Sequence, residues 1–583
     1  MTSLVDADSL LVIDVGAVST RASLFDVAAG RYRFVSQGVA PSTAGAPYRN
    51  IGEGVRLAID QLQKFTGRVL VGPDEQLLIP TGTDGSGVDS FAATFSAGEP
   101  LKIVAVGLLE DVSLESARRL AAAAYGKVVQ VFSLNDRRRT ETRLNLLLRL
   151  RPHLIVMAGG TDQGASQSVM KLLEPIGLAC YLLPQDLRPD VIFAGNQALR
   201  EEIADSLEGV VQAHFTPNIR PELEVEQLDA AQVEMGKIVT RVRSRQLAGV
   251  EELNRWANGH LIPSSAAFGR IVRFLSKVHP GKKGVLGVDL GASATTVASA
   301  FNGELNIGVY PQLGLGTGVD GCLEMVQPKD VLGWLPFELS ESQLREYILN
   351  KSLAPASLPA TAEDLAIEQA LARELLRAAL RQAARSFPSG ISGGQGGLLP
   401  WFDPVLATGA ALVRAPSLAH SALLLLDGVQ PTGVSTLVLD QNQIAPSLGA
   451  AALQNPILVA QVMDSNAFLN LGAVITPVCN VRPGTIILRI KMTRDDGEES
   501  QYEIKQGALE ALPLPAGKAA KLQLQPLHRA DVGMGAPGRG GSLRVTGGAL
   551  GVIIDARGRP FQMPAEREKR QELTKKWLWS LGG

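Results

Sequence analysis

Two short segments of the chain carry residue types that bind phosphate groups and a divalent cation. Asp14 and Asp289 each stand two residues before a glycine, Gly16 and Gly291. A glycine has no Cβ, so phosphate oxygens can approach its backbone closely. The carboxylates can face a Mg²⁺ ion that keeps most of its water ligands. Hydroxyl groups that could add hydrogen bonds follow each glycine, on Ser19, Thr20, Thr295 and Thr296.

The segments that flank the first glycine are predicted to be β-strands. Residues 10–13 form an apolar run typical of a strand buried on both faces, and residues 19–27 have the mixed pattern of a partner strand. No helix is predicted after the glycine, so the backbone N–H groups of a tight turn would hold the phosphate. One Asp-x-Gly turn can be an ordinary turn, but two such hairpins favour a two-lobed nucleotide-binding fold.

Length and composition restrict the class of protein. With 583 residues the chain exceeds the size of one hydrophobic core, so several domains are expected. Its 45% hydrophobic and 20% charged residues are typical of a soluble globular protein, and its net charge of −2 argues against nucleic-acid binding. No apolar run approaches the roughly 20 residues of a transmembrane segment. Cys180, Cys322 and Cys479 are widely spaced, which fits a reducing compartment and predicts a cytoplasmic protein.

The pattern of predicted elements changes along the chain. The first third alternates strand-like and helix-like runs, which predicts an α/β domain around a central sheet. Beyond about residue 460 strands dominate, with a predicted hairpin over residues 485–492 and 501–505. We therefore expect a first lobe with a helical connector over residues 1–278, a second lobe over 279–460, a C-terminal all-β domain over 461–565, and a basic tail with Trp577 and Trp579 over 566–583.

Five segments in a fixed order resemble one known family. They are DVG at residues 14–16, MAGGTDQG at 157–164, FAGNQ at 193–197, DLG at 289–291 and ATGAAL at 407–412. Together they resemble the glutamate mutase L family, which belongs to the actin and sugar-kinase superfamily of ATPases. The resemblance covers roughly residues 10–460, and GGTDQG and AGN are its most family-specific parts.

This resemblance implies an α/β fold with two actin-like lobes of the ribonuclease-H type, and ATP with Mg²⁺ in the cleft between them. Asp14 and Asp289 would match the metal-binding carboxylates. The nucleotide-binding positions carried over are Asp14, Gly16, Ser19, Thr20, Arg21, Gly159, Gly160, Thr161, Asp162, Asp289, Gly291, Thr295, Thr408, Gly409 and Ala410. Family members are associated with coenzyme B12-dependent glutamate mutase. The resemblance therefore also implies a chaperone-like or reactivating factor that acts on a protein partner such as a B12-dependent mutase.

The phosphate segments depart from the family pattern. The departures are Thr296 in place of an acidic residue, Ala298 in place of a histidine, Ala17 and Val18 in place of hydroxyl residues, and Ala410 in place of a glycine. Loss of a positioned catalytic group commonly lowers a rate by about 10²–10⁴. We therefore expect weak hydrolysis or none, and the sequence singles out no catalytic residue. The alternative is an actin-like scaffold that has lost nucleotide use and works through protein association or self-assembly.

Overall fold

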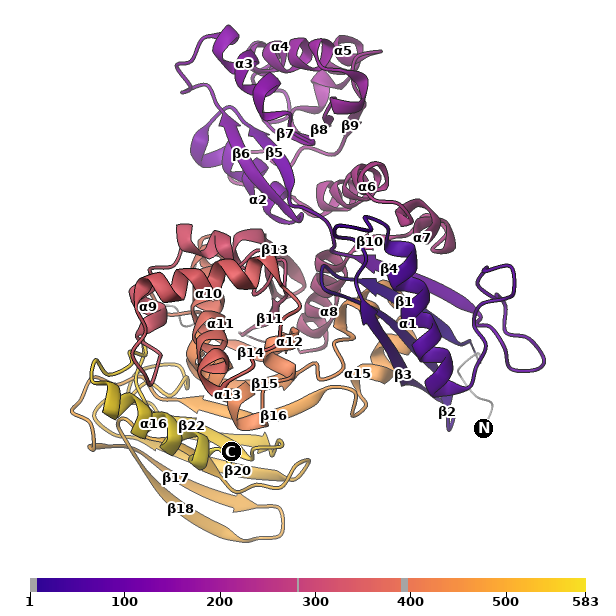
Figure 1. The fold of residues 1–583 in the computed structure, drawn as a ribbon. Coiled ribbons are helices and arrows are strands. Elements are labelled where there is room, and N and C mark those ends of the chain that lie inside the picture. The colour runs from indigo at the N-terminus through magenta and orange to yellow at the C-terminus, as the bar shows by residue number, and fades with distance from the viewer. Residues whose placement is uncertain (1–7, 280, 282, 389–396, 583) are drawn as a thin grey trace.

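The computed structural model describes residues 8–279, 281, 283–388 and 397–582. Figure 1 shows a first lobe in indigo, a second lobe in red and orange, an additional domain in purple at the top, and a β-rich C-terminal part in yellow beneath the second lobe. The lobes follow each other in the chain, but helices cross between them.

The first lobe is built on a five-stranded sheet. In spatial order its strands are β10 (Ile262–Pro263), β4 (Ser90–Phe95), β1 (Leu10–Val15), β2 (Ser19–Ala28) and β3 (Arg31–Pro41). β1, β2 and β3 are antiparallel neighbours, whereas β4 runs parallel to both β1 and β10. Helix α1 (Ile51–Thr66) covers one face, and α14 (Ala445–Ala451) covers the other. β1 is therefore buried along its whole length, as its apolar sequence predicts.

The second lobe repeats this topology. In the same spatial order its strands are β15 (Gly433–Leu439), β14 (Phe402–Thr408), β11 (Gly284–Leu290), β12 (Thr295–Phe301) and β13 (Glu304–Tyr310). Three antiparallel strands are again followed by two parallel ones, β14 beside β11 and β15 beside β14. This duplication of one sheet topology confirms the two-lobed actin-like fold expected from the sequence.

Two helices cross between the lobes and join them through a shared core. Helix α8 (Ser264–Val278) follows β10 of the first lobe but packs on β11, β12 and β13 of the second. Helix α14 follows β15 of the second lobe but packs on β1 and β4 of the first. Gly449 of α14 lies so close to α8 that an added Cβ would stand 1.9 Å from the Ala267 carbonyl oxygen. The close crossing brings the ends of β1 and β11 to the same region.

The remaining helices of the second lobe cover its sheet or surround its outer end. They are α9 (Pro328–Leu332), α10 (Glu341–Leu353), α11 (Ala362–Ala383), α12 (Ala410–Val413) and α13 (Leu418–Gly428). Helix α15 (Pro456–Met463) instead packs on β3 of the first lobe. The long helix α11 begins with a capping box, in which the Asp364 N–H donates to Thr361 Oγ1 at 3.0 Å and the Thr361 N–H donates to Asp364 Oδ2 at 3.1 Å. Its apolar face fills the core of the second lobe together with α13.

The single central sheet expected for the first third of the chain is wrong, because its strands divide between two sheets. Residues 101–228, which we call the insert domain, form a separate parallel sheet with the order β6 (Gly126–Phe132), β5 (Leu101–Val106), β7 (Leu154–Met157), β8 (Asp190–Phe193) and β9 (Ala213–Phe215). Hydrophobic patterns predict strands but do not tell which strands pair. The helices of the insert domain are α2 (Glu115–Ala122), α3 (Thr140–Leu150), α4 (Gln167–Leu182) and α5 (Arg200–Leu207).

Helices α6 (Asp229–Gln246) and α7 (Val250–Trp256) lead from the insert domain back to the first lobe, as Figure 1 shows. α6 contacts both α2 of the insert domain and β10 of the first lobe. The insert domain is thus connected to the first lobe by the short link from β4 to β5 and by this helical return. The helical character expected for the connector is present in both helices.

The C-terminal part contains two sheets. β16 (Leu469–Thr476), β22 (Val552–Asp555) and β19 (Leu509–Leu512) extend the second-lobe sheet to eight strands. β17 (Ile486–Arg494), β18 (Glu499–Lys505), β20 (Ala519–Pro526) and β21 (Gly541–Thr546) form a separate four-stranded antiparallel sheet. The predicted hairpin is confirmed as β17 and β18. The division at residue 461 stays a prediction, and the second-lobe sheet continues across it.

The last helix, α16 (Arg567–Ser580), packs on the second lobe through Trp577, which is 3% exposed. Trp579 points away and is 81% exposed. None of the helices in the described ranges combines the length and the hydropathy needed to cross a bilayer.

Candidate functional site

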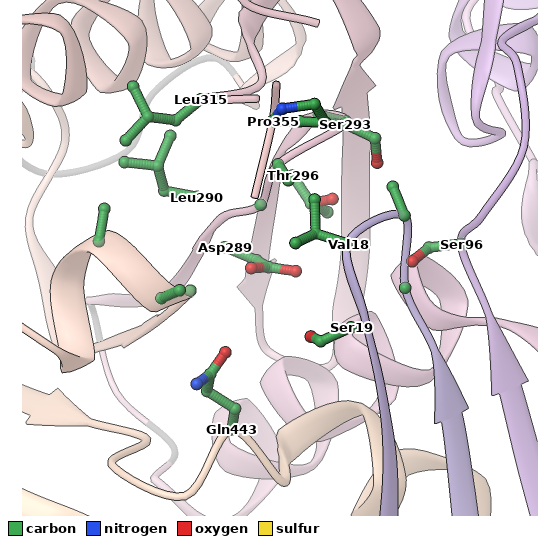
Figure 2. Close-up of a pocket in the computed structure, with 18 of the residues that line it drawn as sticks. Val18, Ser19, Ser96, Asp289, Leu290, Ser293, Thr296, Leu315, Pro355 and Gln443 are labelled. Atoms are coloured by element: carbon green, nitrogen blue, oxygen red, sulfur yellow. The ribbon is translucent and has the colours of Figure 1, made fainter. Parts of the chain in front are cut away.

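A cavity of about 330 Å³ lies between the two lobes. The β1–β2 turn and the β11–β12 turn both line it, and Figure 2 shows Val18 and Ser19 of the first turn opposite Asp289 and Thr296 of the second hairpin. The starts of α8 and α12 and residues 355–359, between α10 and α11, also line it, as do Tyr125 of the insert domain and Arg243 of α6. Small molecules usually bind in such concave sites between parts of a protein.

Asp14 is held by two hydroxyl groups and one arginine. Its carboxylate accepts hydrogen bonds from Thr94 Oγ1 at 2.6 Å and from Ser264 Oγ at 2.9 Å. Arg21 lies across the hairpin from Asp14, with Nη1 3.6 Å from Asp14 Oδ2, and its Nη2 donates to Gln443 Oε1 at 2.7 Å. Asp14 is only 6% exposed, and a buried carboxylate is costly unless polar groups surround it. The Arg21 guanidinium and the two hydroxyl groups supply that compensation.

Asp289 occupies the equivalent position at the end of β11, but it lies opposite the uncharged Thr296. Burial raises the pKa of Asp289 to about 7, the negative charge of Asp14 adds to this effect, and Arg21 opposes it. Asp289 is therefore partly protonated near neutral pH. A cation that enters the cavity beside it would favour the ionised carboxylate.

A third carboxylate, Asp440, follows β15, and its charge also raises the pKa of Asp289. It is fully buried and accepts hydrogen bonds from the Ile444 N–H at 3.0 Å, the Ala445 N–H at 2.8 Å and Thr408 Oγ1 at 3.2 Å. Burial raises the pKa of Asp440 to about 6, although these hydrogen bonds oppose the effect. Because it binds the first N–H groups of α14, Asp440 fixes the start of the crossing helix.

The three glycine turns lie close to the backbone of their neighbours. The Gly16 N–H donates to the Ser19 carbonyl and the Gly291 N–H to the Ala294 carbonyl, both at 3.0 Å, so the two hairpin turns share one geometry. Gly409 has a φ of +108°, and an added Cβ would stand 2.2 Å from the carbonyl oxygen of Leu290. The turn before α12 therefore packs directly on the end of β11, which only glycine permits.

The second lobe alone forms the other end of the cavity. Lys351 of α10 is buried, and its Nζ lies 2.5 Å from Glu368 Oε1 of α11. Gln369 also lines this end, and its Nε2 is buried with no hydrogen-bond partner among the described residues. A buried free donor of this kind suits a ligand that carries a hydrogen-bond acceptor, such as a ring nitrogen of a base. Gly409 and Ala410, at the start of α12, also line the cavity.

The structure brings together most, but not all, of the site residues expected from the sequence. Those that line the cavity are Asp14, Gly16, Ser19, Arg21, Asp289, Gly291, Gly409, Ala410 and also Thr296. Thr20, Thr295 and Thr408 are buried just behind it; Thr295 Oγ1 donates to the Leu313 carbonyl at 2.5 Å. Thr408 Oγ1 donates to Asp440, and Thr20 Oγ1 has no hydrogen-bond partner among the described residues. None of these three residues lines the cavity.

Gly159, Gly160, Thr161 and Asp162 lie elsewhere, in the loop after β7 of the insert domain. Asn218 Nδ2 donates to the Gly160 carbonyl and to Asp162 Oδ1, both at 3.0 Å. None of the four residues lines the cavity between the lobes. The structure therefore does not place this segment with the two Asp-x-Gly hairpins.

Several cavity residues were missed by sequence reasoning. Ser264, Gln369, Gln443 and the pair Lys351 and Glu368 line the cavity, and Asp440 is buried outside its lining. Most of them are single polar residues at element ends, with no motif around them. Asp440 does carry a signal, because an acidic residue shortly before Ala445-Pro446 is typical of a helix start.

The residues at the hairpins fit a Mg²⁺ ion that is bound largely through water and phosphate. Within the described ranges, no group of three or more His, Cys, Asp or Glu side chains is placed to hold a metal ion by itself. The two hairpins offer Asp14 and Asp289, and one or two carboxylates are what protein-bound Mg²⁺ needs when a substrate phosphate supplies further ligands.

Solved structures with a similar arrangement include proteins of different functions. Nucleotide-free acetone carboxylase is 12% identical, with 86% of this chain and 82% of that chain covered and a TM-score of 0.32. The ethanolamine utilization protein EutJ from Carboxydothermus hydrogenoformans is 8% identical, with coverages of 77% and 90% and a TM-score of 0.27. Diol dehydratase-reactivating factor in nucleotide-free form is 12% identical, with coverages of 76% and 99% and a TM-score of 0.29. Because these TM-scores are low, the fold assignment rests on the sheet topology.

Sequence comparison gives a more specific result. Protein MutL of Clostridium tetanomorphum is 26% identical over 216 residues, which is 36% of this chain and 45% of that protein. The match thus spans less than half the length of this curated relative. The sequence model of the family described as MutL protein matches residues 10–467, which include both lobes and the insert domain. The resemblance to the glutamate mutase L family is confirmed, and the chain belongs to the MutL protein family.

Proposed function

We propose that this protein binds ATP with Mg²⁺ between its lobes and acts as a chaperone-like factor on a protein partner. One observation carries the proposal: two equivalent Asp-x-Gly hairpins, one from each lobe, line the same cavity. Tight glycine turns flanked by carboxylates suit a nucleotide phosphate chain with its cation. Asp14 and Asp289 would hold the hydrated cation, and Gly409 with Gln369 would face the nucleoside.

The same residues favour weak hydrolysis or none. Asp289 faces Thr296 across its hairpin, where a second carboxylate would be needed to orient an attacking water. Asp14 accepts the hydrogen bonds from Thr94 and Ser264 on the same oxygen, Oδ1, which leaves Oδ2 for the cation rather than for an attacking water. The nucleotide would then act mainly by holding the lobes together, since the two hairpins bind it from opposite sides.

Membership of the MutL protein family supports a protein partner, and the glutamate mutase L relationship favours a B12-dependent mutase. A factor of this kind changes the shape of its partner through closure and opening of its lobes. The cross-packed helices α8 and α14 provide the hinge region, because each belongs to one lobe in sequence and to the other in packing. Self-association without nucleotide is the competing function.

Calorimetric titration with ATP and Mg²⁺ tests the proposal. We expect saturable binding in the micromolar range for the wild-type protein and at least about tenfold weaker binding for Asp289→Asn, which loses a charged ligand of the cation. Asp186→Asn is the control, because Asp186 is an exposed carboxylate of the insert domain. Absence of binding in the wild-type protein would contradict the proposal. Concentration-dependent light scattering would then show whether the protein instead self-associates.

A further inference from the structure

A second cavity, of about 310 Å³, lies where the insert domain meets the second lobe. Helix α2 of the insert domain forms one wall, and strands β12 and β13 form another. The end of α11 and the following turn, residues 384–386, close the third side. No residue of its lining also lines the cavity between the lobes, so the two sites are separate.

The lining of this second cavity carries excess positive charge. Arg119 is compensated, because its Nη1 lies 2.8 Å from Glu226 Oε2 and its Nε 3.6 Å from Glu115 Oε1. Within the part of the chain that the structure describes, Arg118 approaches only the same Glu115, at 3.8 Å. Arg385 is exposed, and among the described residues it has no ion-pair or hydrogen-bond partner. Glu115, the one carboxylate among the described lining residues, is therefore shared by Arg118 and Arg119, and Arg385 has no carboxylate partner.

Two hydroxyl groups on the sheet face the same cavity. Ser299 is 1% exposed, and its Oγ has no hydrogen-bond partner within the described part of the chain. The Tyr310 hydroxyl lies over Gly308, where an added Cβ would stand 2.4 Å from it. Burial raises the pKa of Tyr310 well above its usual range, so the hydroxyl stays protonated and can donate. A buried hydroxyl without a partner is costly unless a ligand or water satisfies it.

From this combination we propose that the second cavity binds a compact dianion of the phosphate type. Arg385 and Arg118 supply guanidinium groups, which bind phosphate through charge-assisted hydrogen bonds. Ser299 and Tyr310 supply neutral donors on the opposite side. Since α2 belongs to the insert domain and the other walls belong to the second lobe, a bound anion holds these two parts of the molecule together. The proposal does not depend on nucleotide binding, because no residue is shared with that site.

Calorimetric titration of the full-length protein with inorganic phosphate, at constant ionic strength, tests this site. Arg385→Gln removes the uncompensated positive charge. It should weaken phosphate binding about tenfold or more, because one charge-assisted hydrogen bond is lost. Arg381→Gln is the matched control, because Arg381 is exposed one turn earlier on α11 and does not line the cavity. We expect Arg381→Gln to bind phosphate as the wild-type protein does.

Ser299→Ala separates binding from folding. The Ser299 hydroxyl has no hydrogen-bond partner in the described structure, so its removal costs the folded protein no hydrogen bond. We therefore expect the thermal stability of Ser299→Ala to be unchanged or slightly higher. Its phosphate binding should be weaker than that of the wild-type protein. Phosphate that binds between the lobes would respond to neither Arg385→Gln nor Ser299→Ala. Wild-type protein that binds no phosphate at millimolar concentration, or binding that both variants leave unchanged, would overturn the proposal.

Discussion

The two aspartates of the paired hairpins have the same local sequence but different electrostatic surroundings. Asp14 receives hydrogen bonds from Thr94 and Ser264 and faces Arg21. Asp289 faces Thr296, and burial together with the charge of Asp14 raises its pKa to about 7. The carboxylate of Asp289 is therefore the group that responds most to pH and to an added cation.

Replacing Asp289 by asparagine should stabilise the protein at alkaline pH. The pKa of Asp289 is about 7 in the folded protein and about 4 in the unfolded chain. The stability that the protonated side chain contributes is therefore fully present below about pH 4. It is lost as the pH rises through 7, because the unfolded chain ionises Asp289 more readily than the folded protein does. The gain from Asp289→Asn should be small near pH 4.5 and reach a plateau above pH 7. The shift corresponds to at most about 4 kcal/mol, and access of water to the cavity reduces this to about 1–2 kcal/mol.

Urea denaturation of the ligand-free protein at pH 4.5 and pH 8 measures this difference. Asp186→Asn, which changes an exposed carboxylate of the insert domain, should show no such growth with pH. An Asp289→Asn variant that is less stable than the wild-type protein at pH 8 would mean that the carboxylate is stabilised in the folded state. A stabilised variant that has lost nucleotide binding would separate the role of Asp289 in binding from any role in folding.

Gly409 is required by a close contact between backbones. Alanine at this position would be strained at a φ of +108° and would place its Cβ 2.2 Å from the Leu290 carbonyl oxygen, so we expect Gly409→Ala to destabilise the protein by about 3 kcal/mol. Gly67 also has a positive φ, of +69°, but has open space around it. Gly67→Ala should therefore cost only about 1 kcal/mol. Equal losses for the two variants in urea denaturation would argue against the close contact.

Sequence reasoning found the parts of the site that depend on local structure. Asp14, Gly16, Asp289 and Gly291 belong to single hairpins, so their residue types and spacing predict both the turn and its role. Ser264 reaches Asp14 from a position 250 residues away, and no local pattern marks it. Residues of this second kind are placed by the crossing of helices between lobes, which the sequence pattern does not predict.

At the scale of elements, hairpins and caps were predictable, whereas sheet membership was not. The β17–β18 hairpin and the capping box at Thr361 depend on residues close in sequence. The separation of residues 101–228 into their own sheet depends on long-range pairing. So does the extension of the second-lobe sheet by β16, β22 and β19, because a strand pattern carries no information on its partner.

A buried network of charges fixes the C-terminal segment to the second lobe. Asp427 of α13 pairs with Arg373 of α11 and with Arg557, both at 2.8 Å, and Arg557 also pairs with Asp555 at 2.8 Å. The Arg557 guanidinium lies 4.7 Å from the ring centroid of Trp577. Helix α16 therefore completes the core of the second lobe.

Replacing the two tryptophans of α16 should have very different effects. Trp577→Ala removes a buried ring from the second-lobe core and from the charge network, and we expect a loss of about 3–5 kcal/mol. Trp579 lies two residues further on the same helix and is 81% exposed, so Trp579→Ala should change the free energy of unfolding by less than about 0.5 kcal/mol. Urea denaturation followed by circular dichroism measures both. Similar losses in the two variants would show that α16 is not held through Trp577.

At the scale of the whole molecule, the insert domain touches the β11–β12 hairpin of the second lobe. Tyr125 packs on Ala294, which belongs to the β11–β12 turn, and on Val309. Burial raises the pKa of Tyr125, and a hydrogen bond with Ser293 of the same turn opposes the rise. Lys127 lies 3.4 Å from Glu324 of the second lobe and adds an exposed ion pair. A ligand that moves the β11–β12 turn would therefore also move the insert domain.

Tyr125→Phe should weaken this coupling without unfolding the protein, because phenylalanine keeps the ring but loses the hydrogen bond with Ser293. In the wild-type protein we expect Mg-ATP to slow amide hydrogen exchange in residues 115–127, since a nucleotide held at the β11–β12 turn would order the contact with Tyr125. In Tyr125→Phe this protection should fall by about half or more, while the affinity for Mg-ATP measured by calorimetry changes less than about threefold.

Tyr181→Phe is the control, because Tyr181 is 67% exposed on α4 of the same domain. Equal protection in the wild-type protein and Tyr125→Phe would mean that the insert domain senses the nucleotide by another route, such as α6, or not at all.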